Sequence, residues 1–276
     1  MTDHFDWTGR VGDVWAQEWQ RTDRAFAGLA PRLDAAILAA APAGPFTALD
    51  IGCGAGATAA ALAGARLDAR VTGVDLSAAL LDVARTRHAA LPNLAFRHGD
   101  AITTAGALAP LDLAVSRHGV MFFDDPVAAF ARLRQAMAPG GAVVFSCFAP
   151  VADNPWACLL APPAPPAPHY TPGPFAFGDP DRVAAILAAA GWAGVTPTRV
   201  AFAYRVGASD DPVADAIGFL TRIGPAARLL HDSAPADRAA LLARLADRLA
   251  AQRNGSTIDF PAAAWLWTAR ATGELP

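Results

Sequence analysis

Short apolar runs and amphipathic stretches alternate along the first half of the chain. Apolar runs bounded by turn residues predict strands, and apolar residues three or four positions apart predict helices. On this basis, strands are expected at residues 46–51, 70–75, 94–98, 111–116 and 142–148. Helices are expected between them, at residues 57–67, 77–88 and 126–137. Strands that alternate with helices favour a parallel sheet covered on both faces.

Three stretches depart from this alternation. Residues 1–45 carry aromatic residues at near-helical spacing, which predicts helices that form an amino-terminal lid. Residues 150–178 contain a dense proline run, which fits neither a helix interior nor a sheet and predicts a connector or lid. Residues 211–253 carry a leucine stripe and lie between the last expected strands, 195–206 and 262–270. We expect a helical insertion there, which either caps the sheet edge or packs on an outer face.

The composition fits one globular domain and narrows its chemistry. The 276 residues are 54% hydrophobic, enough for a sizeable core, and the net charge of −3 disfavours nucleic acid as a partner. No lysine is present, so neither a lysine Schiff base nor a P-loop can form. Only two glutamates occur, which excludes an H-E-x-x-H zinc helix, and no metal site is expected.

The cysteines and the apolar stretches indicate the compartment. Cys53, Cys147 and Cys158 are an odd number without metal-ligand spacing, so no disulfide framework is expected. The first ten residues lack the apolar region of a signal peptide. Charged or turn residues interrupt every apolar stretch before about 18 residues, the length that a membrane span needs. We therefore expect a cytoplasmic protein without a membrane span.

The most informative motif is a glycine loop that follows the first expected strand. Residues 48–56 read Ala-Leu-Asp-Ile-Gly-Cys-Gly-Ala-Gly, and a helix is expected from residue 57. Glycines allow positive φ and let a ligand touch the bare main chain, while the helix N-terminus offers free N–H groups. The loop, with Gly52, Cys53, Gly54 and Gly56, is therefore predicted to bind a nucleoside cofactor.

Asp50, two residues before the first glycine of the loop, discriminates between two cofactor classes. The loop also fits the dinucleotide pattern G-x-G-x-x-G/A. A carboxylate at this strand end would repel a pyrophosphate by about 1 kcal/mol or more at close range. It would attract an ammonium or sulfonium group. S-adenosylmethionine carries both cations and no phosphate, so Asp50 favours this cofactor over NAD.

Two further strand ends carry carboxylates. Asp75 ends the second strand, where its side chain can accept hydrogen bonds from both ribose hydroxyls. Asp100 and Ala101 follow the third strand, where the carboxylate and the adjacent N–H can read the adenine edge. Leu76 is expected to pack beside the adenine. NAD proteins also place an acid on the ribose, so Asp75 supports a nucleoside without choosing the cofactor.

Together these motifs make the sequence resemble the class I S-adenosylmethionine-dependent methyltransferases. The resemblance covers residues 46–148 and rests on residues 49–56, 74–77, 99–101 and 137–141. Residues 113–126 are similar to a bacterial small-molecule group akin to the ubiquinone and menaquinone biosynthesis methyltransferases, in which phenylalanine often replaces His118. The resemblance implies a seven-stranded, mostly parallel sheet of order 3-2-1-4-5-7-6 with an antiparallel last strand. It also implies cofactor roles for Asp50, Gly52, Gly54, Gly56, Asp75, Leu76, Asp100 and Ala101.

The residues that end the fourth strand are candidates for the reacting centre. Ser116, Arg117 and His118 are expected to face the methyl donor. His118 is a candidate general base, since its usual pKa near 6.5 suits neutral pH, or else it lines the pocket without moving a proton. Arg117 either binds a carboxylate or forms a surface ion pair with Asp124 or Asp125.

The amino-terminal aromatic residues have two interpretations. Trp15 and Trp19 lie four residues apart on an expected helix. In one interpretation Trp15 or Trp19 closes over the cofactor, and Arg21 or Arg24 reaches the carboxylate of the cofactor. In the other, the aromatic face of the helix packs on the sheet.

The predicted reaction is methyl transfer from S-adenosylmethionine to a small, hydrophobic or aromatic molecule. Asn154 and Trp156 either line the acceptor pocket or form a structural turn, and Tyr170 is a candidate for phenol-assisted chemistry. One alternative is an NAD(P)-dependent oxidoreductase that uses the same loop. Another is a regulatory protein that binds S-adenosylmethionine without catalysis.

Overall fold

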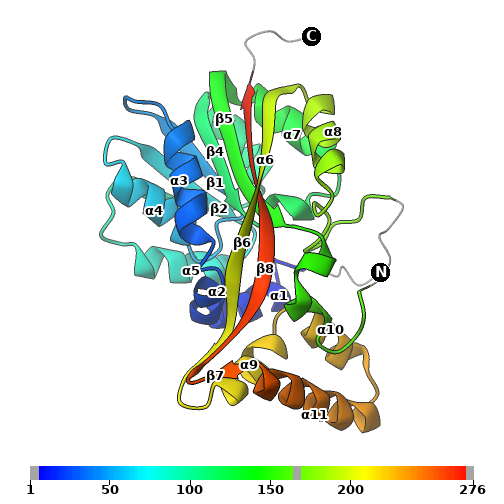
Figure 1. The fold of residues 1–276 in the computed structure, drawn as a ribbon. Helices are drawn as coiled ribbons and strands as arrows, with labels where there is room; N and C mark the ends of the chain where they lie inside the picture. Colours follow the sequence, from blue (N-terminus) through cyan, green and yellow to red (C-terminus); the bar gives the residue numbers. More distant parts are fainter. Residues whose placement is uncertain (1–5, 164–168, 272–276) are drawn as a thin grey trace.

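The computed structural model describes residues 6–163 and 169–271 (Figure 1). Residues 1–5, at the start of the expected lid, and residues 164–168, in the proline run, lie outside the described residues. The rest folds into one mixed sheet that is covered by helices on both faces, with a group of helices below its lower edge in Figure 1.

The sheet has the strand order β3-β2-β1-β4-β5-β8-β6. The central parallel strands are β1 (Thr47–Ile51), β2 (Arg70–Asp75), β3 (Leu94–His98), β4 (Leu111–Arg117) and β5 (Met137–Phe148). β8 (Thr257–Ala271) runs antiparallel between β5 and β6 (Trp192–Ala208). The predicted fold class and order are confirmed. One strand was not expected: β7 (Arg253–Asn254), a two-residue partner of β8, so the antiparallel last strand of the predicted order is β8.

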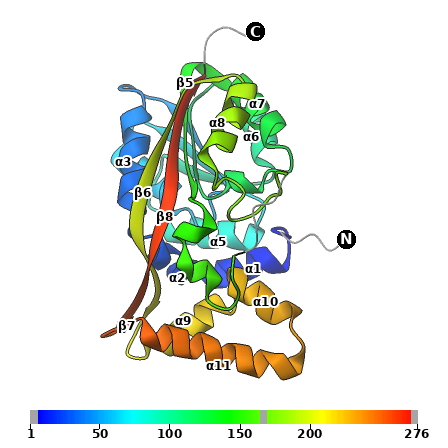
Figure 2. The ribbon, with the colours of Figure 1, turned by 45° about the vertical axis from the view of Figure 1, so that its right-hand side comes forward.

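Helices cover both faces of the sheet (Figure 2). α3 (Ala30–Ala40) and α4 (Ala57–Ala65) pack together on one face. α6 (Ala101–Leu108), α7 (Pro126–Gln135) and α8 (Pro180–Ala189) pack on the other. Side-chain oxygens cap several of these helices at the N-terminus, as predicted for Ser77, which accepts a hydrogen bond from the Leu80 N–H at the start of α5 (Ala78–Arg87).

The two longest strands leave the sheet as an antiparallel ribbon that carries further helices. α9 (Pro212–Leu220), α10 (Pro225–Asp232) and α11 (Pro235–Ala251) lie between β6 and β8 in the chain. Figures 1 and 2 place them below the sheet, on the same side as α1 (Arg10–Gln17) and α2 (Trp19–Ala25). These two helical groups therefore meet at the edge where the parallel strands end.

Some element boundaries differ from the sequence expectations. β5 begins at Met137 and not at residue 142, because Met137 pairs with Leu111 before the register shifts. β6 and β8 are longer than expected because they pair with each other beyond the sheet. Within the residues that the structure describes, no helix combines the length and apolar character needed to cross a bilayer.

Candidate active site

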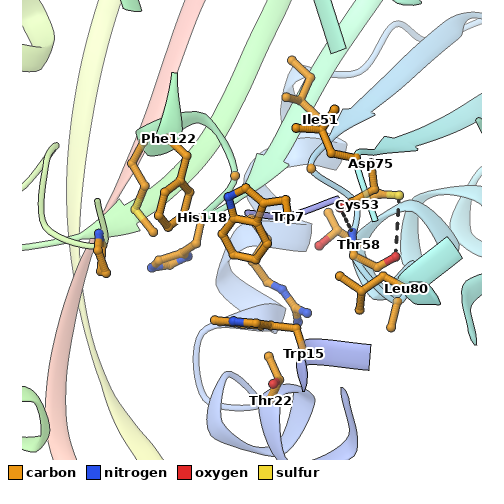
Figure 3. Close-up of a pocket in the computed structure, with 18 of the residues that line it drawn as sticks. Trp7, Trp15, Thr22, Ile51, Cys53, Thr58, Asp75, Leu80, His118 and Phe122 are labelled. Atoms are coloured by element: carbon orange, nitrogen blue, oxygen red, sulfur yellow. Dashed lines mark hydrogen bonds between the residues drawn. The ribbon is translucent and has the colours of Figure 1, made fainter. Parts of the chain in front are cut away.

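A cavity of about 370 Å³ lies at the carboxyl ends of the parallel strands. This is the edge at which open α/β sheets bind ligands. In Figure 3, Asp75, Cys53 and Leu80 lie on one side of the pocket, and His118 and Phe122 lie on the other. The strand tips thus form two ends of one pocket, which we call the acidic end (β1, β2 and β3) and the aromatic end (β4, β5 and β6).

The glycine loop forms the floor of the acidic end. Gly52, Gly54 and Gly56 all have positive φ, between 53° and 83°. Gly52, Cys53 and Gly54 line the pocket, but Gly56 does not. A Cβ on Gly56 would come within 2.7 Å of the Phe96 ring, so this glycine permits packing beneath the loop. Gly56 was predicted to contact the cofactor. In the structure it lies against Phe96 beneath the loop and does not line the pocket.

Asp50 is a fully buried carboxylate in the wall of this pocket. Neither of its oxygens has a hydrogen-bond partner of ordinary geometry. Burial raises the pKa of Asp50 to about 7, although the Arg117 charge and the Ala59 N–H both oppose the shift. A buried, unpartnered carboxylate is costly unless a ligand supplies a cation. The ammonium or sulfonium group of S-adenosylmethionine fits this requirement.

Asp75 links the glycine loop to the end of β2. Its two oxygens accept hydrogen bonds from the Gly54 N–H (2.8 Å) and the Ser77 N–H (2.9 Å). Each oxygen keeps a second lone pair, and the residue lines the pocket. Burial raises the pKa of Asp75, while these N–H groups lower it. The carboxylate is thus held by the backbone in a position suited to two ribose hydroxyls.

Replacing Asp75 tests this assignment. Asp75→Ala is expected to weaken S-adenosylmethionine binding at least about tenfold, because two charge-assisted hydrogen bonds are lost. Calorimetric titration measures the change. Asp125→Ala is the matched control, since Asp125 also accepts a backbone N–H, at the start of α7, but does not line the pocket. An unchanged Kd in Asp75→Ala would show that Asp75 does not contact the cofactor.

Leu76, Asp100 and Ala101 lie together at the far part of the acidic end. Leu76 is 41% exposed, which is unusual for a leucine and leaves an apolar surface for a flat ring. One oxygen of Asp100 caps α6 by accepting from the Thr103 N–H and hydroxyl. The other has no such role. The three residues that were predicted at the adenine therefore share one wall of the pocket.

His118 lies where β4 ends. It is the sole non-glycine with positive φ (62°) among the described residues, a strained conformation that occurs often at functional sites. Burial and the neighbouring Arg117 charge lower the pKa of His118 to about 3, so the ring is neutral at physiological pH. Nδ1 is hydrogen-bonded to the Ser146 hydroxyl at 2.9 Å, and Nε2 is buried without a partner. A resting histidine with this pKa is a weak base.

Arg117 lines the pocket but pairs with a residue distant in sequence. Its guanidinium donates to Asp23 of α2 at 2.8 Å, and Asp23 also accepts from Arg87 of α5. The expected alternative, an ion pair with Asp124 or Asp125, is wrong, because α2 brings Asp23 onto the strand tip. One carboxylate thus pairs with two guanidinium groups.

Ser116 does not line the pocket, contrary to its predicted place at the cofactor. Its hydroxyl is buried, donates to the Ile51 carbonyl (2.7 Å) and accepts from the Gly119 N–H (3.1 Å). The side chain therefore holds the ends of β1 and β4 together. Ser116 is a structural residue of the strand tips.

Comparisons with known proteins agree with this geometry. The methyltransferase domain family matches residues 49–145. Residues 49–145 form a class I S-adenosylmethionine-dependent methyltransferase domain. Trans-aconitate 2-methyltransferase of Methylobacterium radiotolerans is 35% identical over 132 residues, which are 44% of this chain and 49% of that protein. The chain thus matches about half the length of that relative.

Two further proteins are similar to this chain. Malonyl-[acyl-carrier protein] O-methyltransferase of Xylella fastidiosa is 34% identical over 38% of this chain and 36% of that protein. The solved structure of a protein from Bacillus halodurans, described as a methyltransferase, covers 87% of this chain and 98% of its own, with a TM-score of 0.55 and 14% identity. That structure shows a shared fold.

Of the residues at the aromatic end of the pocket, Trp156 was proposed from the sequence, but its aromatic neighbours were not. Phe26, Phe148, Trp156 and Tyr204 line it and contact one another. The closest stack joins Trp156 and Tyr204, with ring centroids 4.4 Å apart and planes at 18°. These residues come from the end of α2, where Phe26 is the C-cap, from β5 and β6, and from the short helix Pro155–Cys158, so no local spacing in the sequence marks them.

The amino-terminal helices contribute aromatic residues to the pocket. Trp7, Trp15 and Trp19 line it, and Trp15 is seen below Trp7 in Figure 3. The Arg87 guanidinium lies 3.8 Å from the centre of the Trp19 ring, a cation–π contact. Trp15 therefore lines the pocket, and its contact with the cofactor stays a prediction.

An ion-pair cluster joins the amino-terminal helices to the insertion. Glu18 is 4% exposed and pairs with Arg21 (2.8 Å) and Arg222 (3.0 Å). Asp215 of α9 pairs with Arg21 and Arg24, both at 2.8 Å. Arg21 and Arg24, which were suggested to reach the cofactor carboxylate, do not line the pocket and pair with Glu18 and Asp215 instead. Both guanidinium groups form ion pairs with Asp215, which join α2 to α9.

Asn154 and Tyr170 have structural roles. The buried Asn154 amide donates to main-chain carbonyls, including Ala263, and its oxygen accepts from the Ala263 and Trp156 N–H groups. The Tyr170 hydroxyl lies within hydrogen-bond distance of the Met121 and Phe123 carbonyls, and burial raises the pKa of Tyr170. Neither side chain points into the pocket, whereas Trp156 lines it.

The remaining polar candidates do not suggest other chemistry. Cys53 is buried, and desolvation raises the pKa of its thiol well above the usual value, so it is unreactive. No group of histidine, cysteine and carboxylate side chains within residues 6–163 and 169–271 could hold a metal ion.

Proposed function

We propose that the chain transfers a methyl group from S-adenosylmethionine to a small aromatic molecule. The observation that carries this proposal is one pocket with two chemically different ends. The acidic end holds a buried carboxylate without a partner, Asp50, and a positioned carboxylate, Asp75. The aromatic end lies across the same cavity and has Phe26, Phe148 and Tyr204 in its wall.

The cofactor fits the acidic end chemically. It supplies a methyl group on a positively charged sulfur, which is already activated for displacement. Asp50 would hold a positive group of the cofactor, Asp75 the ribose, and Leu76 the adenine face. Asp50 disfavours the alternative NAD(P)-dependent oxidoreductase, since a pyrophosphate would meet a carboxylate in a buried site.

The protein itself contributes binding and exclusion of water. Methyl transfer requires that acceptor, methyl and sulfur lie in line, and most of the rate gain comes from this positioning. We propose that α1 and α2, together with α9 and α10, act as lids over the reacting groups, since Trp15 and Ile223 line the pocket. The Glu18 and Asp215 ion pairs would join the two lids.

The acceptor class follows from the pocket wall. Stacked aromatic rings at the far end favour a planar, largely apolar molecule. One relative is named an O-methyltransferase, which supports oxygen as the methylated atom. We therefore propose an aromatic acceptor that is methylated on oxygen.

Transfer of tritium from methyl-labelled S-adenosylmethionine tests this function. Aromatic hydroxyl compounds and aromatic carboxylates are expected to become labelled, and polar acceptors such as amino sugars are not. Turnover of the polar panel with no labelling of the aromatic panel would contradict the acceptor class. Tight cofactor binding with no labelled product from either panel would instead identify a non-catalytic binding protein.

A further inference from the structure

Two features place His118 at the junction between the two ends of the pocket. Gly119, the next residue, approaches the cofactor loop so closely that a Cβ there would lie 3.2 Å from the Gly52 Cα. The His118 ring itself lies among the aromatic side chains, with centroids 4.7 Å from Phe26 and 4.3 Å from Phe148. His118 therefore lines the pocket between the cofactor loop and the aromatic end.

The Ser146 hydroxyl determines which His118 nitrogen carries the proton. Among the described residues this hydroxyl has one hydrogen-bond partner, His118 Nδ1. If Nδ1 carried the proton and donated, the hydroxyl hydrogen of Ser146 would be left buried without an acceptor, which is costly. If Ser146 donates to Nδ1, both groups are satisfied. The proton of the neutral ring then lies on Nε2, the nitrogen that has no protein partner.

We propose that His118 is a neutral hydrogen-bond donor that binds an ionised oxygen of the aromatic acceptor, and that it is not a general base. This inference rests on the proposed methyl transfer. A protonated Nε2 cannot accept a proton from the acceptor without first losing its own. An ionised oxygen needs no base, but in a buried site it needs a donor and a nearby cation. Arg117, which lines the pocket next to His118, supplies the positive charge.

The charges balance without a proton transfer. A lone pair of the ionised acceptor oxygen forms the new O–C bond, the S–C bond breaks, and its electron pair stays on sulfur. The anion and the sulfonium become a neutral ether or ester and a neutral thioether. The ligand chemistry required is thus an ionised oxygen on a planar aromatic framework, either a phenolate or a carboxylate.

Two substitutions at position 118 separate a donor from a base. His118→Gln keeps an N–H donor near the place of Nε2 but cannot act as a base. His118→Phe removes the donor, and both variants must adopt the same positive φ. With ionised naphthols we expect kcat/KM to fall ~10- to 100-fold in His118→Phe and to stay within ~5-fold of wild type in His118→Gln. The S-adenosylmethionine Kd is expected to remain near the wild-type value in both.

The acceptor series gives a second test. For a single naphthol, kcat/KM is expected to rise with pH in proportion to the ionised fraction of the naphthol, and naphthoates compared in parallel identify phenolate or carboxylate as the preferred oxygen. Equal loss in His118→Gln and His118→Phe, or equally fast reaction of un-ionised naphthols, would overturn the donor role. Failure of the wild type to methylate any aromatic acceptor would overturn the proposed function, and this inference with it.

The protonated nitrogen can also be observed without turnover. In ¹⁵N-histidine-labelled protein, the His118 signals, assigned by their loss in His118→Phe, are expected to show a protonated Nε2 and an unprotonated Nδ1. A protonated Nδ1 would contradict the assignment.

Discussion

Asp50→Asn is expected to weaken S-adenosylmethionine binding by more than ~100-fold and, at the same time, to raise the melting temperature of the ligand-free protein at pH 8. The first effect follows because the buried carboxylate would lose its charge, and removal of one partner of a buried ion pair costs about 3–5 kcal/mol. The second follows because the ligand-free protein buries this carboxylate without a hydrogen-bond partner. Asparagine avoids that buried charge.

The raised pKa of Asp50 determines how the stability of the folded protein depends on pH. The pKa of Asp50 is raised to about 7 in the folded protein, whereas an unfolded aspartate has a pKa near 3.9. Between these values the folded state binds a proton that the unfolded state has lost, so this residue adds stability as the pH falls through 7. The gain in melting temperature from Asp50→Asn is therefore expected to be larger at pH 8 than at pH 5. Scanning calorimetry at both values measures it, and near wild-type cofactor affinity in the variant would contradict the role of Asp50.

Gly119→Ala is expected to lower the free energy of unfolding by about 2 kcal/mol or more and to weaken cofactor binding more than ~10-fold. A Cβ on Gly119 would lie 2.6 Å from the Ile51 carbonyl oxygen and 2.8 Å from the Ser116 hydroxyl. Main-chain atoms cannot move aside as a flexible side chain can. The tips of β1 and β4 must therefore separate, which displaces the glycine loop.

Gly106→Ala provides the matched control. Gly106 lies on the exposed side of α6, and an added Cβ would meet nothing within 4 Å. Alanine in a helix interior is favoured over glycine by about 1 kcal/mol, so this variant should be slightly stabilised with unchanged binding. Urea denaturation and calorimetric titration compare the two variants. Equal behaviour of both would mean that the close approach at Gly119 has no consequence.

The sheet and the acidic end could be predicted because their signals are local. A strand that runs into a glycine loop and then a helix is contiguous in sequence, and the carboxylates of Asp50, Asp75 and Asp100 each stand at or beside a strand end. Once the strands are parallel, their carboxyl ends meet at one edge. The pocket accordingly brings these three side chains into one wall.

The aromatic end could not be predicted because its residues come from distant parts of the chain. Phe26 follows α2 directly, Phe148 and Tyr204 stand on β5 and β6, and tertiary packing alone brings them together. The same limitation explains Arg117, whose partner Asp23 is 94 positions away and not in the adjacent turn. Charged neighbours in the sequence are a poor guide to ion-pair partners when a helix from another part of the chain packs on the strand end.

The charge at Asp50 is the central claim, and parallel calorimetric titrations with S-adenosylmethionine and NADH at pH 8 test it most directly. The buried carboxylate predicts saturable binding of S-adenosylmethionine with one site per chain and no measurable binding of NADH. Binding of NADH that is as tight as that of S-adenosylmethionine, or tighter, would contradict it.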